Sequence, residues 1–214
     1  RLHSQGTGPK ITWGAEVTGL SPREIDKIRR LEILGLTGSA AGKCSRTIHA
    51  LIHGPKADPA YSIRWSAVKL YLDVWWNSNQ EVKDEFKEAW PSFLRDHLPR
   101  VRWQRVDGAL PGLVATLRDL GWMPYAADAW LDHRGKTWLI PEHPVATLEM
   151  KDAIDDAVER SLAKEMGAHY HGSGLEHRPI WRPLKKMLAE IGDDTKEQRM
   201  LVGSTLSIFA GGTW

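Results

Sequence analysis

Helix-punctuation signals recur along most of this chain, and they constrain its fold more than any other feature of the sequence. The clearest set is Ser21-Pro22-Arg23-Glu24, which places a capping hydroxyl, a proline suited to the first helical turn and a capping-box carboxylate in order. Apolar residues then recur on one helical stripe, at Ile25, Ile28, Leu31 and Leu34. Gly35 predicts the end of this helix.

The same signals predict a succession of further helices. We expect them over Ser45 to about His53, Asp58 to Trp76, Asn79 to Leu98, Leu113 to Leu120, Val145 to Met166, Trp181 to Ile191 and Lys196 to about Phe209. Pro91 lies inside the third of these and predicts a kink or a split. The helical spacing of apolar residues gives way only at residues 129–140. There, two short apolar and aromatic runs flank Gly135 and predict a β-hairpin. The fold is therefore predicted to be mainly α with one small sheet.

The length of 214 residues suits one large domain or two small ones. We predict a boundary in the stretch from Pro99 to Gly121. It separates a helical unit, residues 1–100, from a unit with the hairpin and the last helices, residues 101–214. Eleven Trp against three Phe indicate that the apolar surface is buried in a few Trp-centred clusters.

The net charge of +2 is unevenly distributed. From Ser21 to Leu70 there are nine Lys and Arg residues and four acids, whereas from Glu149 to Glu165 six acids oppose three cations. A basic N-terminal third suits a polyanion, although solvated helix faces often have the same composition. One hypothesis is that five cations follow a phosphate backbone, namely Arg23, Lys27, Arg30, Lys43 and Arg46. The alternative is that the helix packs its Ile/Leu stripe on the core and its charges are simply solvated.

Cys44 is the only cysteine, so an internal disulfide and a Cys-rich zinc site are excluded. This suits a reducing intracellular compartment, the nucleus or the cytoplasm. No apolar run approaches the roughly 20 residues that a membrane-spanning helix needs. The chain starts without Met and stops at Trp214, and we interpret both ends as cuts through a longer polypeptide.

The segment from Gly38 to Ser45 has some features of a phosphate-binding loop. A nucleotide-binding loop needs four residues between its glycines and Ser or Thr directly after its Lys. Here three residues intervene and Cys44 follows Lys43, so we expect no nucleotide cofactor. The plain alternative is a tight inter-helix connection. A third interpretation is that Lys43 and free N–H groups at a helix start hold a backbone phosphate.

Catalytic and metal-binding signals are weaker. His169, His171 and His177 form the only cluster with metal-ligand character, and alternate imidazoles on an extended segment suit zinc. The alternative is a set of exposed loop histidines. The Tyr125 to Asp128 segment resembles a polymerase metal-binding turn only superficially, because that turn needs two adjacent carboxylates. We expect no complete active site, no bound metal and no cofactor in this chain.

The N-terminal region resembles the end of the palm and the start of the thumb in reverse transcriptases of non-LTR retroelements. The match covers Trp13-Gly-Ala-Glu-Val17, then Leu31 to Gly38, and then the paired helices through Trp76. The remainder, with the Trp130 to Gly135 motif and the final Phe-Ala-Gly-Gly-Thr-Trp, is similar to the thumb-to-tail region of dinoflagellate retroelement-like proteins. The resemblance implies a helical thumb-like bundle. It also implies that Arg23, Lys27, Arg30, Lys43 and Arg46 grip a template–primer duplex.

The sequence thus predicts a non-catalytic fragment of a reverse-transcriptase-like protein that holds an RNA–DNA or DNA duplex by its backbone. If the parent protein is active, the resemblance implies an RNA-directed DNA polymerase, but the fingers and the catalytic palm are missing from this chain. The alternative is a helical structural subunit that docks through its Trp clusters into a larger protein assembly. A third hypothesis is a metal-dependent hydrolase built on the three histidines.

Overall fold

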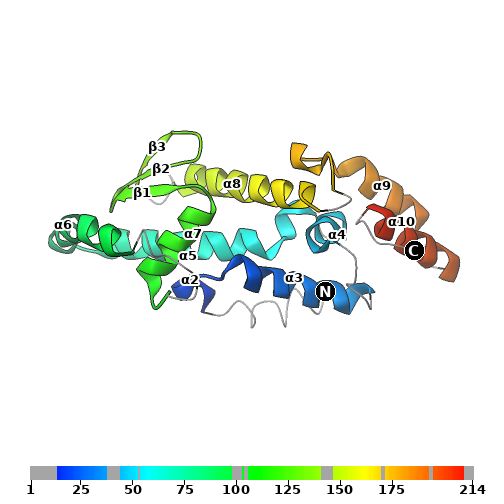
Figure 1. Ribbon diagram of the computed structural model, residues 1–214, viewed down its shortest axis with the longest axis horizontal. Helices are drawn as coiled ribbons and strands as arrows, with labels where there is room; N and C mark the ends of the chain where they lie inside the picture. Colours follow the sequence, from blue (N-terminus) through cyan, green and yellow to red (C-terminus); the bar gives the residue numbers. More distant parts are fainter. Residues whose placement is uncertain are drawn as a thin grey trace. The chain divides into compact units, whose positions relative to one another are not determined.

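The computed structural model describes residues 14–37, 44–52, 54–97, 103, 106–140, 147–169, 172–192 and 195–209. Within these residues the protein is mainly α-helical, with one three-stranded antiparallel sheet among the helices (Figure 1). This confirms the fold class that the helix signals predict.

The chain divides into two compact units, and each combines two separate stretches of sequence. The sheet unit comprises residues 1–21 and 62–158, and the helical unit comprises residues 22–61 and 159–214. The sequence predicts two consecutive domains that meet near residue 100, and the observed division differs from this prediction. Composition can mark a linker, but it does not show which distant segments pack together.

The sheet unit is built around aromatic side chains. Its helices are α2 (Ala15–Thr18), α5 (Pro59–Asn77) from Ser62 onward, α6 (Gln80–His97), α7 (Ala109–Asp119) and the first part of α8 (Thr147–Gly167). The ring centroid of Tyr71 lies 5.9 Å from that of Trp90 and 5.7 Å from that of Trp130. The Tyr71 hydroxyl donates to the carbonyl of Ala127 at 2.8 Å, and Trp90 Nε1 donates to the carbonyl of Pro124 at 3.0 Å. The predicted Trp-centred core is confirmed; Tyr71 and Trp90 find backbone partners, whereas the buried Nε1 atoms of Trp122 and Trp130 have none among the described residues.

The sheet has the order β1-β2-β3, with strands β1 (Met123–Ala126), β2 (Ala129–Leu131) and β3 (Thr137–Leu139). Strands β2 and β3 form the predicted hairpin, with Trp130 opposite Trp138. Strand β1 was not predicted, because it has four residues and includes Pro124. The register between β1 and β2 is irregular between Met123 and Ala126.

Asp132 organises the turn of the hairpin. Its Oδ1 atom accepts hydrogen bonds from the backbone N–H groups of Arg134 and Lys136, at 2.8 and 2.9 Å. Its Oδ2 atom accepts one from Trp138 Nε1 at 3.0 Å. Burial disfavours the charged carboxylate, but these donors outweigh that effect and lower the pKa of Asp132. Gly135 completes the turn with a φ of 81°, a value that favours glycine.

The helical unit contains α3 (Pro22–Thr37), α4 (Ser45–Ile52), the 3-10 turns η2 (Pro55–Ala57) and η6 (Leu175–His177), α8 from Glu159 onward, α9 (Arg182–Ile191) and α10 (Lys196–Phe209). Ile33 of α3 packs on Ile48 of α4, with Ile52 beside them. Cys44 is a buried free thiol that packs with Ala163 and Met166. Short helices thus bury their apolar stripes against one another, as helical periodicity predicts.

Two local predictions need correction, and of the kink or split predicted at Pro91 only the split is excluded. Helix α3 continues past Gly35 to Thr37, because glycine in a helix lowers its stability without forcing an end. Leu31 and Leu34 were predicted on the inner stripe of α3, but they are 58 % and 50 % exposed. Helix α6 runs through Pro91 without a split, and the buried Trp90 anchors it at this point.

Candidate nucleic-acid interface

The inner side of α3 contains a charged residue as well as apolar ones. Ile25, Ile28 and Ile33 are buried, and so is Arg29, which is only 3 % exposed. The guanidinium of Arg29 makes two hydrogen bonds to the carboxylate of Asp58, from Nε to Oδ2 at 2.7 Å and from Nη2 to Oδ1 at 2.8 Å. This side of the helix therefore includes a buried bidentate ion pair that replaces part of the expected Ile/Leu stripe.

Asp58 has a second role at the start of α5. Its Oδ1 atom also accepts the backbone N–H of Ala60 at 2.9 Å, so the side chain caps the helix. Burial opposes the charge on Arg29, but Asp58, together with Glu165 and Asp26, outweighs this effect and raises the pKa of Arg29. The Asp58-Pro59 helix start is visible in the sequence, whereas the pairing with Arg29 is not, since the two residues are far apart along the chain.

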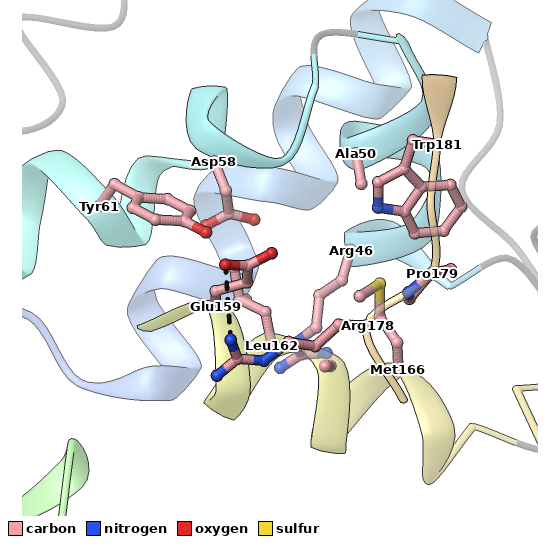
Figure 2. A pocket seen from close by; sticks show the side chains of 11 residues that line it. Arg46, Ala50, Asp58, Tyr61, Glu159, Leu162, Met166, Arg178, Pro179 and Trp181 are labelled. Atoms are coloured by element: carbon pink, nitrogen blue, oxygen red, sulfur yellow. Dashed lines mark ion pairs between the residues drawn. The ribbon is translucent and has the colours of Figure 1, made fainter. Parts of the chain in front are cut away.

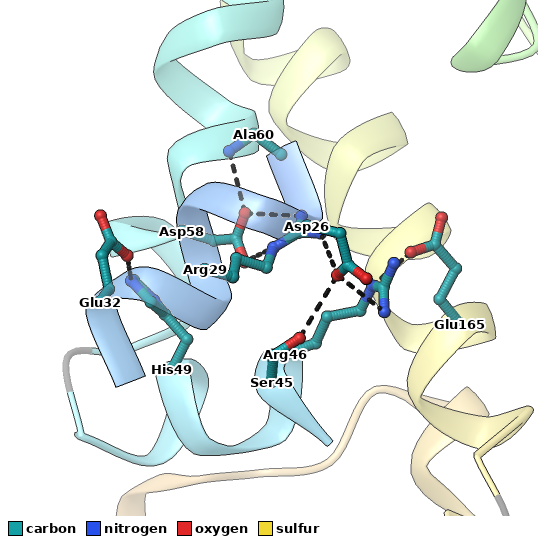
Figure 3. A network of polar contacts seen from close by, with 9 residues as sticks. All are labelled: Asp26, Arg29, Glu32, Ser45, Arg46, His49, Asp58, Ala60 and Glu165. Atoms are coloured by element: carbon teal, nitrogen blue, oxygen red, sulfur yellow. Dashed lines mark hydrogen bonds and ion pairs between the residues drawn. The ribbon is translucent and has the colours of Figure 1, made fainter. Parts of the chain in front are cut away.

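Arg46 lies in a network of polar side chains centred on Asp26 (Figure 3). Its Nη1 atom is 3.3 Å from Asp26 Oδ1, and its Nε atom pairs with Glu165 of α8. The hydroxyl of Ser45 donates to the same Asp26 oxygen at 3.3 Å. Arg46 thus joins α3, α4 and α8 within the helical unit, and two carboxylates already balance its charge.

A neighbouring pair extends this polar network along α3 and α4. His49 Nε2 lies 2.7 Å from Glu32 Oε2, and both side chains are shielded from solvent (Figure 3). Neither residue was singled out by sequence reasoning. Their positions on two different helices left no local signal.

The remaining predicted cations of α3 lie on its outer side. Arg23, Lys27 and Arg30 are all exposed, and their spacing of four and three residues places them on one face of the helix. Arg30 Nη2 is 3.5 Å from Asp26 Oδ2, which is a weak pair for an exposed side chain. We call these three residues the outer basic face of α3.

The exposed leucines accompany this face. Leu34 falls between Lys27 and Arg30 in helical projection, and Leu31 lies beside them. The sequence alone suggested the opposite orientation for both leucines. The buried side of α3 contains Ile25, Ile28 and Ile33. Compared with the predicted side, it is rotated about the helix axis by part of a turn, and this rotation leaves Leu31 and Leu34 exposed.

The other predicted site residues are dispersed or fall outside the described residues. Lys43 and most of the glycine-rich segment before Ser45 lie outside the described residues, as does His171. His169 is half-buried near the end of α8, whereas His177 is exposed and lies 3.5 Å from Glu176. Within the described part of the chain, no group of three or more His, Cys, Asp or Glu side chains is arranged to hold a metal ion.

One small pocket lies in the helical unit next to the polar network (Figure 2). Asp58, Tyr61 and Glu159 line one side of it, and Met166 and Trp181 line the other. Its volume of about 20 Å³ has room for one or two water molecules, not for a metabolite.

Arg178 also reaches this pocket and lies 3.9 Å from Glu159. Its φ of 59° is the only positive value of a non-glycine residue among those described. The tight turn at η6 accounts for this conformation, since the N–H of Arg178 donates to the carbonyl of Leu175 at 3.3 Å.

Comparisons with known proteins do not identify a relative. No family model, no curated protein and no solved structure matches this chain. Among the described helices, none is both long and apolar enough to cross a lipid bilayer.

Proposed function

We propose that the helical unit binds a nucleic-acid duplex by its phosphate backbone, through the outer basic face of α3. The observation that carries this proposal is the separation of cations in this unit. Arg29 is buried against Asp58 and the half-buried Arg46 pairs with Asp26 and Glu165, whereas Arg23, Lys27 and Arg30 share one exposed face. Three cations on one helix face match the repeating negative charge of a phosphate strand.

The resemblance of the α3 region to a reverse-transcriptase thumb supports a template–primer duplex, RNA–DNA or DNA, as the ligand. In that role α3 holds the duplex without reading its sequence, because contacts to phosphates carry no base information. Because Arg46 pairs with Asp26 and Glu165, the proposed contacts in the described residues are Arg23, Lys27 and Arg30. Such a role fits a reducing compartment, the nucleus or the cytoplasm.

A second candidate function is docking into a larger protein assembly through the same face. Leu31 and Leu34 favour it, because exposed leucines add nothing to a phosphate contact but contribute to a protein interface. In this alternative the three cations form a polar rim around the two leucines.

The test measures the affinity of the chain for a fluorescently labelled RNA–DNA duplex. Fluorescence anisotropy of the duplex reports binding, at about 50 mM salt. Replacement of Arg23, Lys27 and Arg30 together by Ala should weaken binding at least about tenfold. The matched control replaces three exposed cations elsewhere, Lys69, Arg95 and Lys186, by Ala, and should bind like the wild type.

The outcomes separate the two candidates. If the wild-type chain does not bind the duplex at low salt, the nucleic-acid proposal is withdrawn. If both triple variants lose the same affinity, net charge and not the outer basic face explains the binding. Changing Leu31 and Leu34 to Ala should leave duplex affinity within about twofold, whereas a protein-docking face would depend on them.

A further inference from the structure

The sheet has two edges, and only one of them is protected against pairing with another strand. At the β1 edge, Pro124 has no N–H to donate, and the irregular register between Met123 and Ala126 disturbs the ladder. Prolines and irregularities of this kind are the usual means by which sheet edges avoid pairing. Strand β3 contains only Thr137, Trp138 and Leu139, so it has neither a proline nor a charged side chain.

The hydrogen-bond pattern shows which backbone groups of β3 point away from the sheet. Ile140 N–H donates to the carbonyl of Asp128 at 2.7 Å, and Asp132 N–H donates to the carbonyl of Lys136 at 2.9 Å. Because antiparallel pairs alternate, Trp138 and its partner also form a hydrogen-bonded pair. The N–H and C=O groups of Thr137 and Leu139 therefore point outward from β3. Among the described residues, no strand pairs with this outer edge.

The side chains at this edge are open and apolar. Leu139 is 72 % exposed, the highest value among the large apolar side chains of the sheet, and Thr137 is also exposed. Leu131 and Met123 extend the same face, since they align with Thr137 across the strands, and both are exposed. The flanking Lys136 does not protect this edge against pairing with another strand, because its charge is held at the Trp138 ring. Its Nζ atom lies 3.7 Å from the ring centroid.

We propose that the outer edge of β3 pairs with the same edge of a second copy of this chain, in antiparallel orientation about Trp138. In this arrangement Thr137 of one copy lies opposite Leu139 of the other, and each such pair exchanges two backbone hydrogen bonds. The three-stranded sheet becomes a six-stranded sheet with two-fold symmetry.

The chemistry of β3 favours a second copy over a charged peptide. The strand is uncharged, so pairing with itself brings no like charges together, and it offers no charge by which to select an acidic or a basic partner. The edge is only three residues long, so the dimer should be weak and depend on concentration.

Sedimentation equilibrium over a wide range of protein concentration tests this proposal. The wild-type mass should rise from 24.1 kDa toward twice that value as the concentration increases. Leu139→Lys places a charge at the symmetric edge and should keep the chain monomeric at every concentration. The matched control Leu131→Lys puts the same charge on the same face of the central strand and should still dimerise.

Amide hydrogen exchange provides a second readout that needs no variant. The amides of Thr137 and Leu139 should exchange quickly in dilute protein and at least about tenfold more slowly in concentrated protein, whereas the Trp138 amide should be protected at both concentrations. A chain that stays monomeric at all concentrations overturns the proposal. A dimer that forms without protection of Thr137 and Leu139, or that survives Leu139→Lys, also overturns it, because the contact then lies elsewhere.

Discussion

At the scale of single residues, the ion pair with Asp58 explains why Arg29 is buried while other cations of α3 lie on the surface. Removal of Arg29 would leave the Asp58 carboxylate buried without its cation. We expect Arg29→Ala to lower the free energy of unfolding by about 3–5 kcal/mol, measured by urea denaturation. Arg30→Ala, which removes an exposed cation one position further along, should change it by less than about 1 kcal/mol. Equal effects would show that Arg29 is not buried as described.

The lowered pKa of Asp132 predicts how the stability of the fold changes in acid. Its pKa in the folded protein is lowered, so its stabilising effect is present above the ordinary Asp pKa of 3.8 and is lost as the pH falls below that value. Asp132→Asn keeps the side-chain size but replaces one acceptor oxygen by a donor toward Trp138 Nε1. We expect the variant to be about 1–3 kcal/mol less stable at pH 7. The difference should shrink as the pH falls below 3.8 and the wild-type carboxyl becomes protonated, and a difference that stays constant on acidification would contradict the assignment.

At the scale of the element, α3 shows what periodicity can and cannot predict. The start of the helix at Pro22 and its helical character follow from the capping and apolar signals in the sequence. Its orientation does not, because Ile25, Ile28, Leu31 and Leu34 are compatible with several burial directions about the helix axis. The choice among them depends on α4 and on the buried Arg29, and neither is encoded locally.

The orientation of α3 can be measured with alanine substitutions. Ile28→Ala and Ile33→Ala should each lower the free energy of unfolding by about 2–4 kcal/mol, because both side chains are buried. Leu31→Ala and Leu34→Ala should change it by less than about 0.5 kcal/mol, since both are largely exposed. Chemical denaturation of the four variants checks this. Large losses at the two leucines would restore the orientation that the sequence suggested.

The hairpin shows a similar division between local and distant information. Residues 129–140 were predictable because two apolar runs flank a turn with Gly135, and the turn is closed by neighbouring residues. Strand β1 was not predictable, since Pro124 argues against a strand and Met123 pairs with Leu131 through tertiary contact.

At the scale of the whole molecule, the sequence shows which segments are helical but not which of them pack together. Each compact unit joins stretches from both halves of the chain, whereas composition suggested a cut near residue 100. The same holds for the candidate site. Its five predicted cations were chosen by sign and proximity in sequence. The partner of Arg46 on α8, Glu165, lies more than a hundred residues away and takes Arg46 out of the proposed contact set.

A salt titration of duplex binding tests most directly whether the exposed cations of α3, and not the paired ones, contact the phosphates. Three phosphate contacts predict that the logarithm of the binding constant falls with the logarithm of salt concentration with a slope of about −2.7 for the wild type. Each single change, Arg23→Ala, Lys27→Ala or Arg30→Ala, should reduce the magnitude of this slope by about 0.9. Arg46→Ala, which removes a cation already paired with two carboxylates, should leave the slope unchanged if the fold is retained. A slope that responds to Arg46 but not to the three residues of the outer basic face would contradict the account.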